Sequence, residues 1–384
     1  MKKILFISAR DPFSGRFSGD VIRANKFINF LSKKYQVEII SLGEVNKNFK
    51  RKNLKNSIFK KENFILRELK ILNQILNIKP LHFGMFYSSK MKKYINEVHK
   101  NYEIIFCQSI RSFQFVPKKI TSKLILDMGD LYSKNYYQTY KNLSYFHPLK
   151  IIYLVESYLV RKYEKYCMSR ADKTLLFSRK EIRQIKGVSK NKIFQINFGI
   201  DKVKKLFKYD LKNFKIIFIG NIKYTPNRKA CSDFINNIFP IVKKKFPNLE
   251  FHIFGEIYSI DKYFFMNKNG VKIFGKVKNL EPYLSNVICG LANLRISTGI
   301  QTKLLTYMSY GIPCICSKKV YENFDKIQSI KLDYYENDKQ FINHIFRLMQ
   351  NKKYSNKISS KSLSVAKDFK WDKVLEIFNR VFIK

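Results

Sequence analysis

The chain has 384 residues, of which 45% are hydrophobic and 15% aromatic, and its formal net charge is +45. This length predicts two domains rather than one core, and the apolar content excludes a disordered protein. The charge favours polyanionic partners such as anionic lipid, nucleic acid or phosphorylated substrates, although AT-rich codons alone would also yield many lysines.

The N-terminus begins with a short apolar run that ends at Ala9, before Arg10 and Asp11. A run this short predicts a buried strand rather than a secretion signal. No other run approaches the roughly 18–20 apolar residues that a membrane span requires.

Strand-like runs alternate with helical stretches along the whole chain. The first series is KILFIS (3–8), VEIISL (37–42), EIIFCQS (103–109), KLILDM (123–128), KTLLFS (173–178) and KIFQIN (192–197). The second series is KIIFIG (215–220), LEFHIFG (249–255), VKIFG (271–275), GLANLR (290–295) and PCICS (313–317). Strands separated by helices predict parallel sheets covered on both faces, with ligands at the carboxyl ends of the strands. We therefore expect an α/β protein with two Rossmann-like domains joined near residues 197–214.

Residues 49–79 combine an apolar stripe with a basic cluster. The stripe has helical spacing, which usually marks a core face, and consists of Ile65, Leu69, Leu72 and Leu76. The cluster surrounds Ile58 and Phe59 and consists of Lys50, Arg51, Lys52, Lys55, Lys60 and Lys61. Protruding apolar residues among cations can rest on an anionic bilayer, and a solvated face explains the pattern equally well.

The cysteines lie in apolar contexts and show no metal-ligand spacing: Cys107, Cys167, Cys231, Cys289, Cys314 and Cys316. They are interpreted as small buried residues in a reducing compartment.

The stretch RISTGIQTKLLTYMSYGIPCICS (295–317) places a glycine and a lysine at the start of a predicted helix. Unpaired amides make a helix N-terminus an anion site, and Gly299 allows the backbone to approach the anion closely. Lys303 lies one turn into the helix and can reach the same anion, while Ser297 and Thr298 are predicted caps. The alternative is a capped helix with an exposed lysine.

Three further loops at strand ends carry glycines beside charged residues. They contain Gly220 and Asn221 with Lys223, Arg228 and Lys229; Gly255 with Glu256; and Gly15 and Gly19 before Arg23. Together the four loops favour a phosphorylated ligand held between two domains.

Over essentially its whole length the chain resembles glycosyltransferases of the GT-B fold, family 4, the group 1 glycosyl transferases. The pieces that carry the resemblance follow in order: the loop 15–23, KPLHFGMFYS (79–88), LDMGDLYSKNYYQTY (126–140), RKYEKYCMSRADKTLLFSRKE (161–181), INFGID (196–201), FIGNIKYTPN (218–227), the block that ends in GIQTKLLTYMSYGIPCICS, and AKDFKWDKVLEIFNRVF. Several are similar to a subgroup that accompanies exopolysaccharide genes.

The resemblance implies two Rossmann-like domains facing across a cleft and a C-terminal helix that crosses back to the first domain. It implies an acceptor-binding domain over 1–200, a nucleotide-sugar-binding domain over 201–365 and the returning helix over 366–384.

Site residues are carried over by position in the same way. The donor would contact Gly15, Arg16, Gly220, Asn221, Lys223, Gly255, Glu256, Arg295, Thr298, Gly299, Ile300, Gln301 and Thr306. Gly19, Asp20 and Arg23 would lie near the acceptor, and the catalytic residues would be Lys303, Asp130 and Asp127.

The chain departs from the family pattern at three positions. Thr298 and Thr306 replace two glutamates, of which the second usually binds the ribose, and Gly129 replaces a histidine that often precedes Asp130. These changes leave a catalytically impaired homologue as one alternative function.

The implied reaction moves a sugar from a nucleoside-diphosphate sugar to a glycan or lipid-linked acceptor. The resemblance implies retention of anomeric configuration. No metal and no cofactor are expected, because fixed amides and Lys303 would stabilise the leaving diphosphate. The implied product is a bacterial surface polysaccharide such as capsule or lipopolysaccharide, made by a cytoplasmic protein that can bind the inner face of the plasma membrane. No nucleic acid partner is expected.

Two rival functions depend on other patterns. A nucleic-acid-binding protein would need basic and stacking residues gathered in one module, whereas the lysines here are spread along the chain. A sugar-nucleotide 2-epimerase would be expected to gather histidine and carboxylates at strand ends, and the five histidines do not cluster there.

Overall fold

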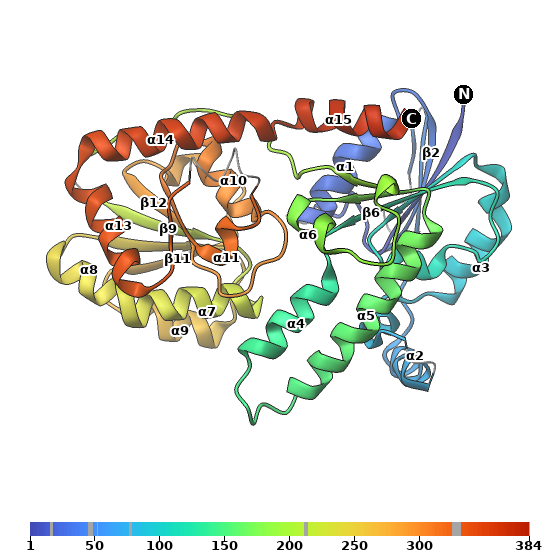
Figure 1. Ribbon diagram of the computed structural model, residues 1–384, viewed down its shortest axis with the longest axis horizontal. Coiled ribbons are helices and arrows are strands. Elements are labelled where there is room, and N and C mark those ends of the chain that lie inside the picture. The colour runs from blue at the N-terminus through green and yellow to red at the C-terminus, as the bar shows by residue number, and fades with distance from the viewer. Residues whose placement is uncertain are drawn as a thin grey trace. The chain divides into compact units, whose positions relative to one another are not determined.

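A computed structural model describes residues 1–15, 18–44, 49–51, 53–76, 79–210, 214–324 and 332–383 (Figure 1). The chain forms two compact units. Unit 1 contains Met1–Phe198 and Leu375–Lys384, and unit 2 contains Gly199–Val374.

Unit 1 is built on an eight-stranded sheet in the order β3-β4-β2-β1-β5-β6-β7-β8. Its strands are β1 (Lys3–Ser8), β2 (Gln36–Leu42), β3 (Phe49–Arg51), β4 (Leu54–Phe59), β5 (Ile104–Gln108), β6 (Lys123–Gly129), β7 (Lys173–Leu176) and β8 (Ile193–Gln195). Only the β3–β4 pair is antiparallel. Its helices are α1 (Gly19–Leu31), α2 (Phe64–Leu76), η2 (Leu81–Phe86), α3 (Ser89–Val98), η3 (His99–Asn101), η4 (Ser112–Phe115), α4 (Tyr132–Asn142), α5 (Lys150–Arg170), α6 (Arg179–Gln184) and η5 (Lys190–Lys192).

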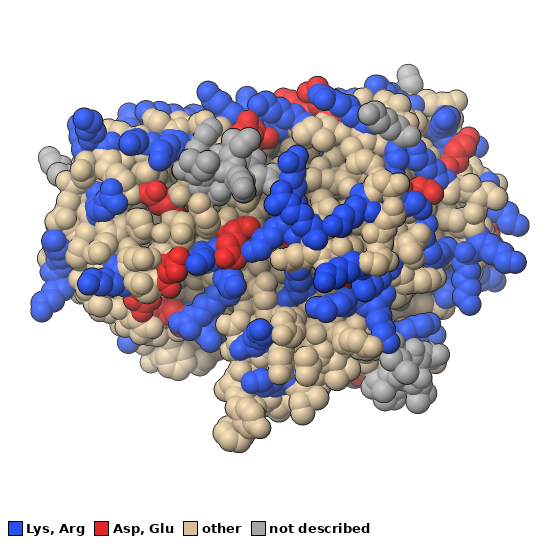
Figure 2. All heavy atoms as spheres, in the orientation of Figure 1, with Lys and Arg blue, Asp and Glu red and all other residues tan. Residues whose placement is uncertain are grey.

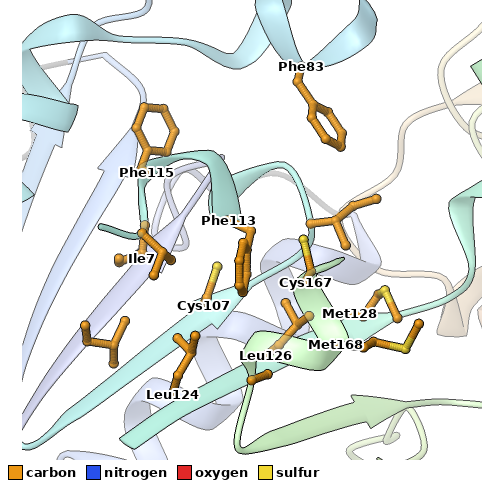
Figure 3. Close-up of a cluster of buried hydrophobic side chains, with 14 of the residues drawn as sticks. Ile7, Phe83, Cys107, Phe113, Phe115, Leu124, Leu126, Met128, Cys167 and Met168 are labelled. Atoms are coloured by element: carbon orange, nitrogen blue, oxygen red, sulfur yellow. The ribbon is translucent and has the colours of Figure 1, made fainter. Parts of the chain in front are cut away.

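The central strands of unit 1 are buried on both faces, as their continuous apolar runs predict. Every residue of β5 is buried, and β6 is buried from Leu124 onward. Leu124 and Leu126 meet side chains from α5 and η4, including Cys167, Met168 and Phe113, in one core cluster (Figure 3).

Unit 2 is built on a six-stranded parallel sheet in the order β11-β10-β9-β12-β13-β14. Its strands are β9 (Lys215–Ile219), β10 (Glu250–Phe254), β11 (Val271–Gly275), β12 (Val287–Ala292), β13 (Cys314–Ser317) and β14 (Tyr334–Tyr335). Its helices are α7 (Thr225–Asp233), the π-helical turn η6 (Phe234–Ile238), α8 (Phe239–Lys245), α9 (Ser259–Met266), η7 (Glu281–Tyr283), α10 (Thr302–Ser309), α11 (Lys318–Tyr321), α13 (Asp338–Gln350), α14 (Lys352–Ala366) and η8 (Lys367–Phe369).

The last helix, α15 (Trp371–Ile383), begins in unit 2 and ends in unit 1. Phe378 stacks on Phe27 of α1 with ring centroids 4.2 Å apart, and Lys173 Nζ donates a hydrogen bond to the carbonyl of Val381 at 2.5 Å. The predicted fold class, with two Rossmann-like parallel sheets and a returning C-terminal helix, is therefore confirmed.

Three details differ from the sequence-based expectations. The strand expected over 290–295 lies at Val287–Ala292, and β4, which was not expected, contains the apolar pair of the basic cluster. Ile58 is only 4% exposed and Phe59 packs against the core, so neither protrudes for a membrane. Conversely, Ile65 and Leu69 of α2 are 70% and 55% exposed, so they do not form a core face.

Parts of those two predictions fall outside the described residues. Lys52 is one such residue, and the side chains of Lys50, Arg51, Leu72 and Leu76 are not described either. The six cysteines are all buried, as expected. Across the described part of the chain, no helix has the length and apolar character needed to cross a bilayer.

Candidate functional site

The loops after β9 and β10 meet at the carboxyl edge of the sheet in unit 2. The amide of Gly220 donates to the carbonyl of Phe254 at 2.9 Å. Gly255 has φ +135°, and a Cβ built there would lie 1.8 Å from the carbonyl oxygen of Gly220. Only glycine fits at 255, so this residue fixes how closely the two loops approach.

The same two loops bring together Lys223 and Glu256, both expected near the donor. The amides of Ile222 and Lys223 donate to the carbonyl of Glu256 at 2.7 and 3.2 Å. Lys223 Nζ lies 3.9 Å from Glu256 Oε2 at an exposed position, where an ion pair contributes little energy. Both side chains remain accessible to a ligand from solvent.

Helix α10 begins at Thr302, and its N-cap is Gln301, so the prediction that Ser297 and Thr298 cap it is wrong. Gln301 Nε2 instead donates to Ser297 Oγ at 3.0 Å and to the carbonyl of Thr298 at 3.3 Å. Gly299 has φ +58°, a left-handed conformation that favours glycine. The carbonyl of Gln301 accepts from the amides of Leu304 and Leu305 at 3.0 and 3.3 Å, and the amides of a first helical turn have no partner within the helix.

Lys303 points into the protein rather than toward solvent. Its side chain is 6% exposed, its Nζ donates to Asn227 Oδ1 at 2.6 Å, and the same nitrogen lies 3.9 Å from the ring centre of Phe218. Asn227 Nδ2 in turn donates to the carbonyl of Asn221 at 2.8 Å. A Cβ built on Gly220 would lie 3.4 Å from Nζ, so the ammonium group lies at the carboxyl end of β9.

Burial lowers the pKa of Lys303 from 10.5 to about 7, because the charged form loses its hydration. Within the described residues, no aspartate or glutamate pairs with this nitrogen to offset that loss. The site therefore contains a cation that lacks an anionic partner. A phosphate group placed beside it would restore the charged form.

Tyr307, one turn further along α10, was not predicted as a site residue. Its hydroxyl accepts from the amide of Ile219 at 2.8 Å and donates to the carbonyl of Leu291 at 3.3 Å. A Cβ on Gly290 would lie 2.4 Å from its ring, so glycine in β12 makes room for the tyrosine. These contacts fix the rotation of α10 and thereby the direction of Lys303. The sequence signal that could have revealed this contact was a glycine within an apolar strand.

The remaining predicted donor residues of unit 2 differ in accessibility. Thr298 and Ile300 are 9% and 6% exposed, so only their backbone groups are suitable for a ligand. Thr306 is half-exposed and its Oγ1 donates to the carbonyl of Thr302 at 3.0 Å. Arg295 forms a surface ion pair with Asp233 at 2.9 Å.

In unit 1 the predicted residues Arg23 and Asp127 form a buried ion pair. Arg23 Nε lies 2.8 Å from Asp127 Oδ2, a second bond joins Nη2 to Oδ1 at 2.9 Å, and each side chain is 2% exposed. Arg23 Nη1 also donates to the carbonyl of Asn197 at 2.7 Å. This burial contradicts the expectation that Arg23 faces the acceptor and that Asp127 orients it, because both groups are enclosed by protein.

Asp130, which follows β6, differs from Asp127 in its hydrogen bonding. Its Oδ1 is buried and has no hydrogen-bond partner among the described residues. Desolvation, with Glu181 nearby, raises the pKa of this carboxyl well above its usual range. A buried carboxyl with a raised pKa is typical of groups that transfer protons, so Asp130 is retained as a candidate for that role.

The other predicted residues of unit 1 lie in the loop before α1. Gly15 has φ +70° and Gly19 is the first residue of α1, while Asp20 Oδ2 pairs with Arg10 at 2.8 Å on the surface. Arg16 lies outside the described residues.

Part of the chain is similar in sequence to a known protein family. Residues 213–351 match the family described as Glycosyl transferases group 1. No curated protein sequence matches the chain.

Several solved structures share the fold along nearly the whole chain. HepE of Anabaena, solved with UDP and glucose, aligns at 10% identity over 100% of this chain and 99% of its own, with a TM-score of 0.65. A variant of S. aureus TarM, solved with fondaparinux, alpha-GlcNAc-glycerol and UDP, aligns at 11% identity over 100% of both chains, with a TM-score of 0.66. The trehalose-6-phosphate synthase OtsA aligns at 9% identity over 99% of this chain and 98% of its own, with a TM-score of 0.64.

Structural likeness at these identities shows the fold alone, and the family match lies within unit 2. The segment that matches the family contains β9, β10 and α10, which form the site around Lys303. The chain therefore has the GT-B fold, and residues 213–351 match the group 1 glycosyl transferases.

Proposed function

We propose that this enzyme transfers a sugar from a nucleoside-diphosphate sugar to an acceptor hydroxyl, with the diphosphate held at the start of α10 in unit 2. The observation that carries the proposal is Lys303, a buried amine whose hydrogen-bond partner among the described residues is a neutral oxygen, Asn227 Oδ1. It lies beside Gly220, on the helix whose first turn follows Gly299. HepE and TarM, which share the fold, were solved with UDP.

The physical role of this arrangement is to stabilise the leaving group. Negative charge grows on the diphosphate as the bond to the sugar breaks, and preorganised donors lower that barrier. The backbone amides of Gly299, Ile300 and Gln301, with the ammonium of Lys303, would supply the positive charge. No metal is then required for charge neutralisation, and no cofactor enters the reaction.

The nucleotide would extend from this point over the loops of β9 and β10. Lys223 would add a second, solvent-exposed cation, and Gly255 with Glu256 would lie beside the base. Thr306 would meet the ribose with a hydroxyl where a carboxylate is usual in the family. A weaker hold on the ribose follows, because a neutral acceptor makes a weaker hydrogen bond than a charged one.

We further propose retention of configuration, with the leaving phosphate accepting the proton of the acceptor hydroxyl. The acceptor would be a lipid-linked or growing glycan of a bacterial surface polysaccharide, at the inner face of the plasma membrane. The resemblance to an exopolysaccharide-associated subgroup and the net charge of +45 support this setting.

The proposal is tested by thermal unfolding with UDP-, GDP- and CMP-sugars. A ligand at about one hundred times its Kd stabilises a single site by about 2.7 kcal/mol, which raises the midpoint by several degrees. We expect one nucleotide class to give this shift, Lys303→Ala to abolish it, and Lys244→Ala, at an exposed lysine of α8, to leave it unchanged. An unchanged shift in Lys303→Ala would show that the nucleotide binds elsewhere.

Turnover is then measured as nucleoside diphosphate release with acceptor extracts. Release that depends on the acceptor supports the transferase. Tight donor binding without release from any acceptor would instead favour the catalytically impaired homologue.

A further inference from the structure

Helices α4 and α5 form a hairpin that projects from the sheet of unit 1, with residues 143–149 at its tip (Figure 1). At the base of the hairpin, hydrogen bonds join α4 to α5. Ser133 donates to the buried carboxylate of Glu164 from its amide at 3.0 Å and from its hydroxyl at 2.5 Å. Further out, the rings of Tyr136 and Tyr153 pack with centroids 6.0 Å apart. The hairpin is thus a defined structural element rather than a loose loop.

The outer part of this hairpin exposes large apolar side chains. Phe146 is 91% exposed, Tyr145 82% and Ile151 73%. Five more lie close by in sequence and are between 39% and 56% exposed: Leu149, Ile152, Leu154, Val155 and Tyr158. Contiguous apolar surface of this kind is costly in water and marks a surface that binds something.

The charges of the hairpin indicate what it binds. Its two carboxylates, Glu156 and Glu164, are 3% and 2% exposed and accept hydrogen bonds from within unit 1. Lys141 and Lys150 flank the apolar tip, and the other cations lie further along the two helices: Lys134, Arg161, Lys162, Lys165 and Arg170. In Figure 2 the projecting end is mostly uncharged, with basic residues around it and no acidic residue visible over the tip.

Several cations lie against aromatic rings. Lys141 Nζ lies 5.0 Å from the ring centre of Tyr137, and Lys162 Nζ lies 4.6 Å from that of Tyr158. Lys150 Nζ lies 5.6 Å from the ring centre of Tyr145 at the tip. Aromatic rings beside lysines are typical of protein surfaces at the headgroup level of a bilayer, where the rings bury and the ammonium groups meet phosphate.

We infer that the α4–α5 hairpin docks unit 1 on an anionic lipid bilayer. Tyr145, Phe146 and Ile151 enter the headgroup region, while the flanking lysines pair with lipid phosphates. Insertion stays interfacial, because no described helix is apolar enough to span. The inference rests on the proposed function only in so far as a lipid-linked acceptor would lie at that surface, and docking is measured without any donor.

Vesicle flotation tests the inference with the full chain, using phosphatidylcholine alone and phosphatidylcholine mixed with phosphatidylglycerol. The wild type should float with the anionic vesicles, and less at high salt. The tip variant Tyr145→Ser/Phe146→Ser/Ile151→Ser should lower the partition constant by more than about tenfold. The cation variant Lys141→Gln/Lys150→Gln should lower it by roughly fivefold per lysine on anionic vesicles only.

The matched control is Ile377→Ser, at a residue of α15 that belongs to unit 1 and is 45% exposed. It is compared with the single tip variant Ile151→Ser, at a residue that is 73% exposed, and only the tip variant should lower flotation. Circular dichroism and the thermal midpoint check that each variant is folded.

A second measurement reports insertion directly. Tyr145→Trp places a fluorophore at the tip, and brominated phosphatidylcholine should quench it, whereas the native Trp371, which is 5% exposed, should be unaffected. Equal flotation of the wild type and the tip variant would overturn the inference. A wild-type dimer without lipid that the tip variant dissociates would also overturn it, because the patch would then be a protein interface. A tip variant that no longer floats but still binds nucleotide would show that docking and the proposed function are tested independently.

Discussion

Replacement of Lys303 by methionine should stabilise unit 2 while removing nucleotide binding. Burial lowers the pKa of Lys303 from 10.5 to about 7, a difference worth about 5 kcal/mol against the folded, charged form. Methionine has similar length and no charge, so it removes this cost. Loss of the hydrogen bond to Asn227 offsets about 1–3 kcal/mol of the gain, which leaves a net stabilisation of about 2–4 kcal/mol near pH 6.

The stabilisation should depend on pH in a defined direction. Below about pH 7 the lysine is protonated in both states, and the wild type bears the full cost. Between about pH 7 and pH 10.5 the unfolded chain binds the proton and the native protein does not, so the wild type gains about 1.4 kcal/mol per pH unit. The advantage of Lys303→Met should therefore shrink by about 2 kcal/mol between pH 7 and about pH 9.

Urea unfolding followed by tryptophan fluorescence measures this difference. The chain has one tryptophan, Trp371, which lies in unit 2 and packs against Gly199. Other titrating groups are shared by both proteins and cancel in the comparison. The interpretation of Lys303 as a buried ammonium without an anionic partner would be refuted by a methionine variant that is less stable at every pH. It would also be refuted if the variant and the wild type had the same pH dependence.

Three further predictions concern residues that the structure places in supporting roles. Arg23→Met should lower the free energy of unfolding by about 3–5 kcal/mol, because it leaves Asp127 charged and buried. The double variant Arg23→Met/Asp127→Leu should recover most of that loss. Equal urea midpoints for the single and double variants would contradict the role of the ion pair. Gly255→Ala should lower the free energy of unfolding by at least about 3 kcal/mol, because the added Cβ would meet the carbonyl of Gly220. An unchanged unfolding midpoint in the same fluorescence assay would contradict this close contact. Tyr307→Phe should lower the free energy of unfolding by about 1–2 kcal/mol, because the amide of Ile219 in β9 loses its acceptor. Nucleotide binding should not change. A loss of binding would show that the hydroxyl does more than position α10.

The alternation of apolar runs with helical stretches was enough to predict two parallel sheets and most of their strands. The strand over Lys3–Ser8 and the one over Val271–Gly275 lie where their apolar runs indicated, because burial on both faces needs little beyond local composition. A helix after Gly299 was likewise visible from its apolar spacing, although it begins at Thr302 and not directly after Ser297 and Thr298.

Side-chain partners and exposure required the tertiary structure. Lys303 and Asn227 are 76 residues apart, and Arg23 and Asp127 are 104 apart, so no local pattern could show that one lysine turns inward or that one pair is buried. The same holds for apolar residues of similar type: Ile58 is covered by neighbouring elements, whereas Ile151 is not. Local sequence determines which periodic element forms, but the direction and burial of each side chain depend on which distant segments pack against it.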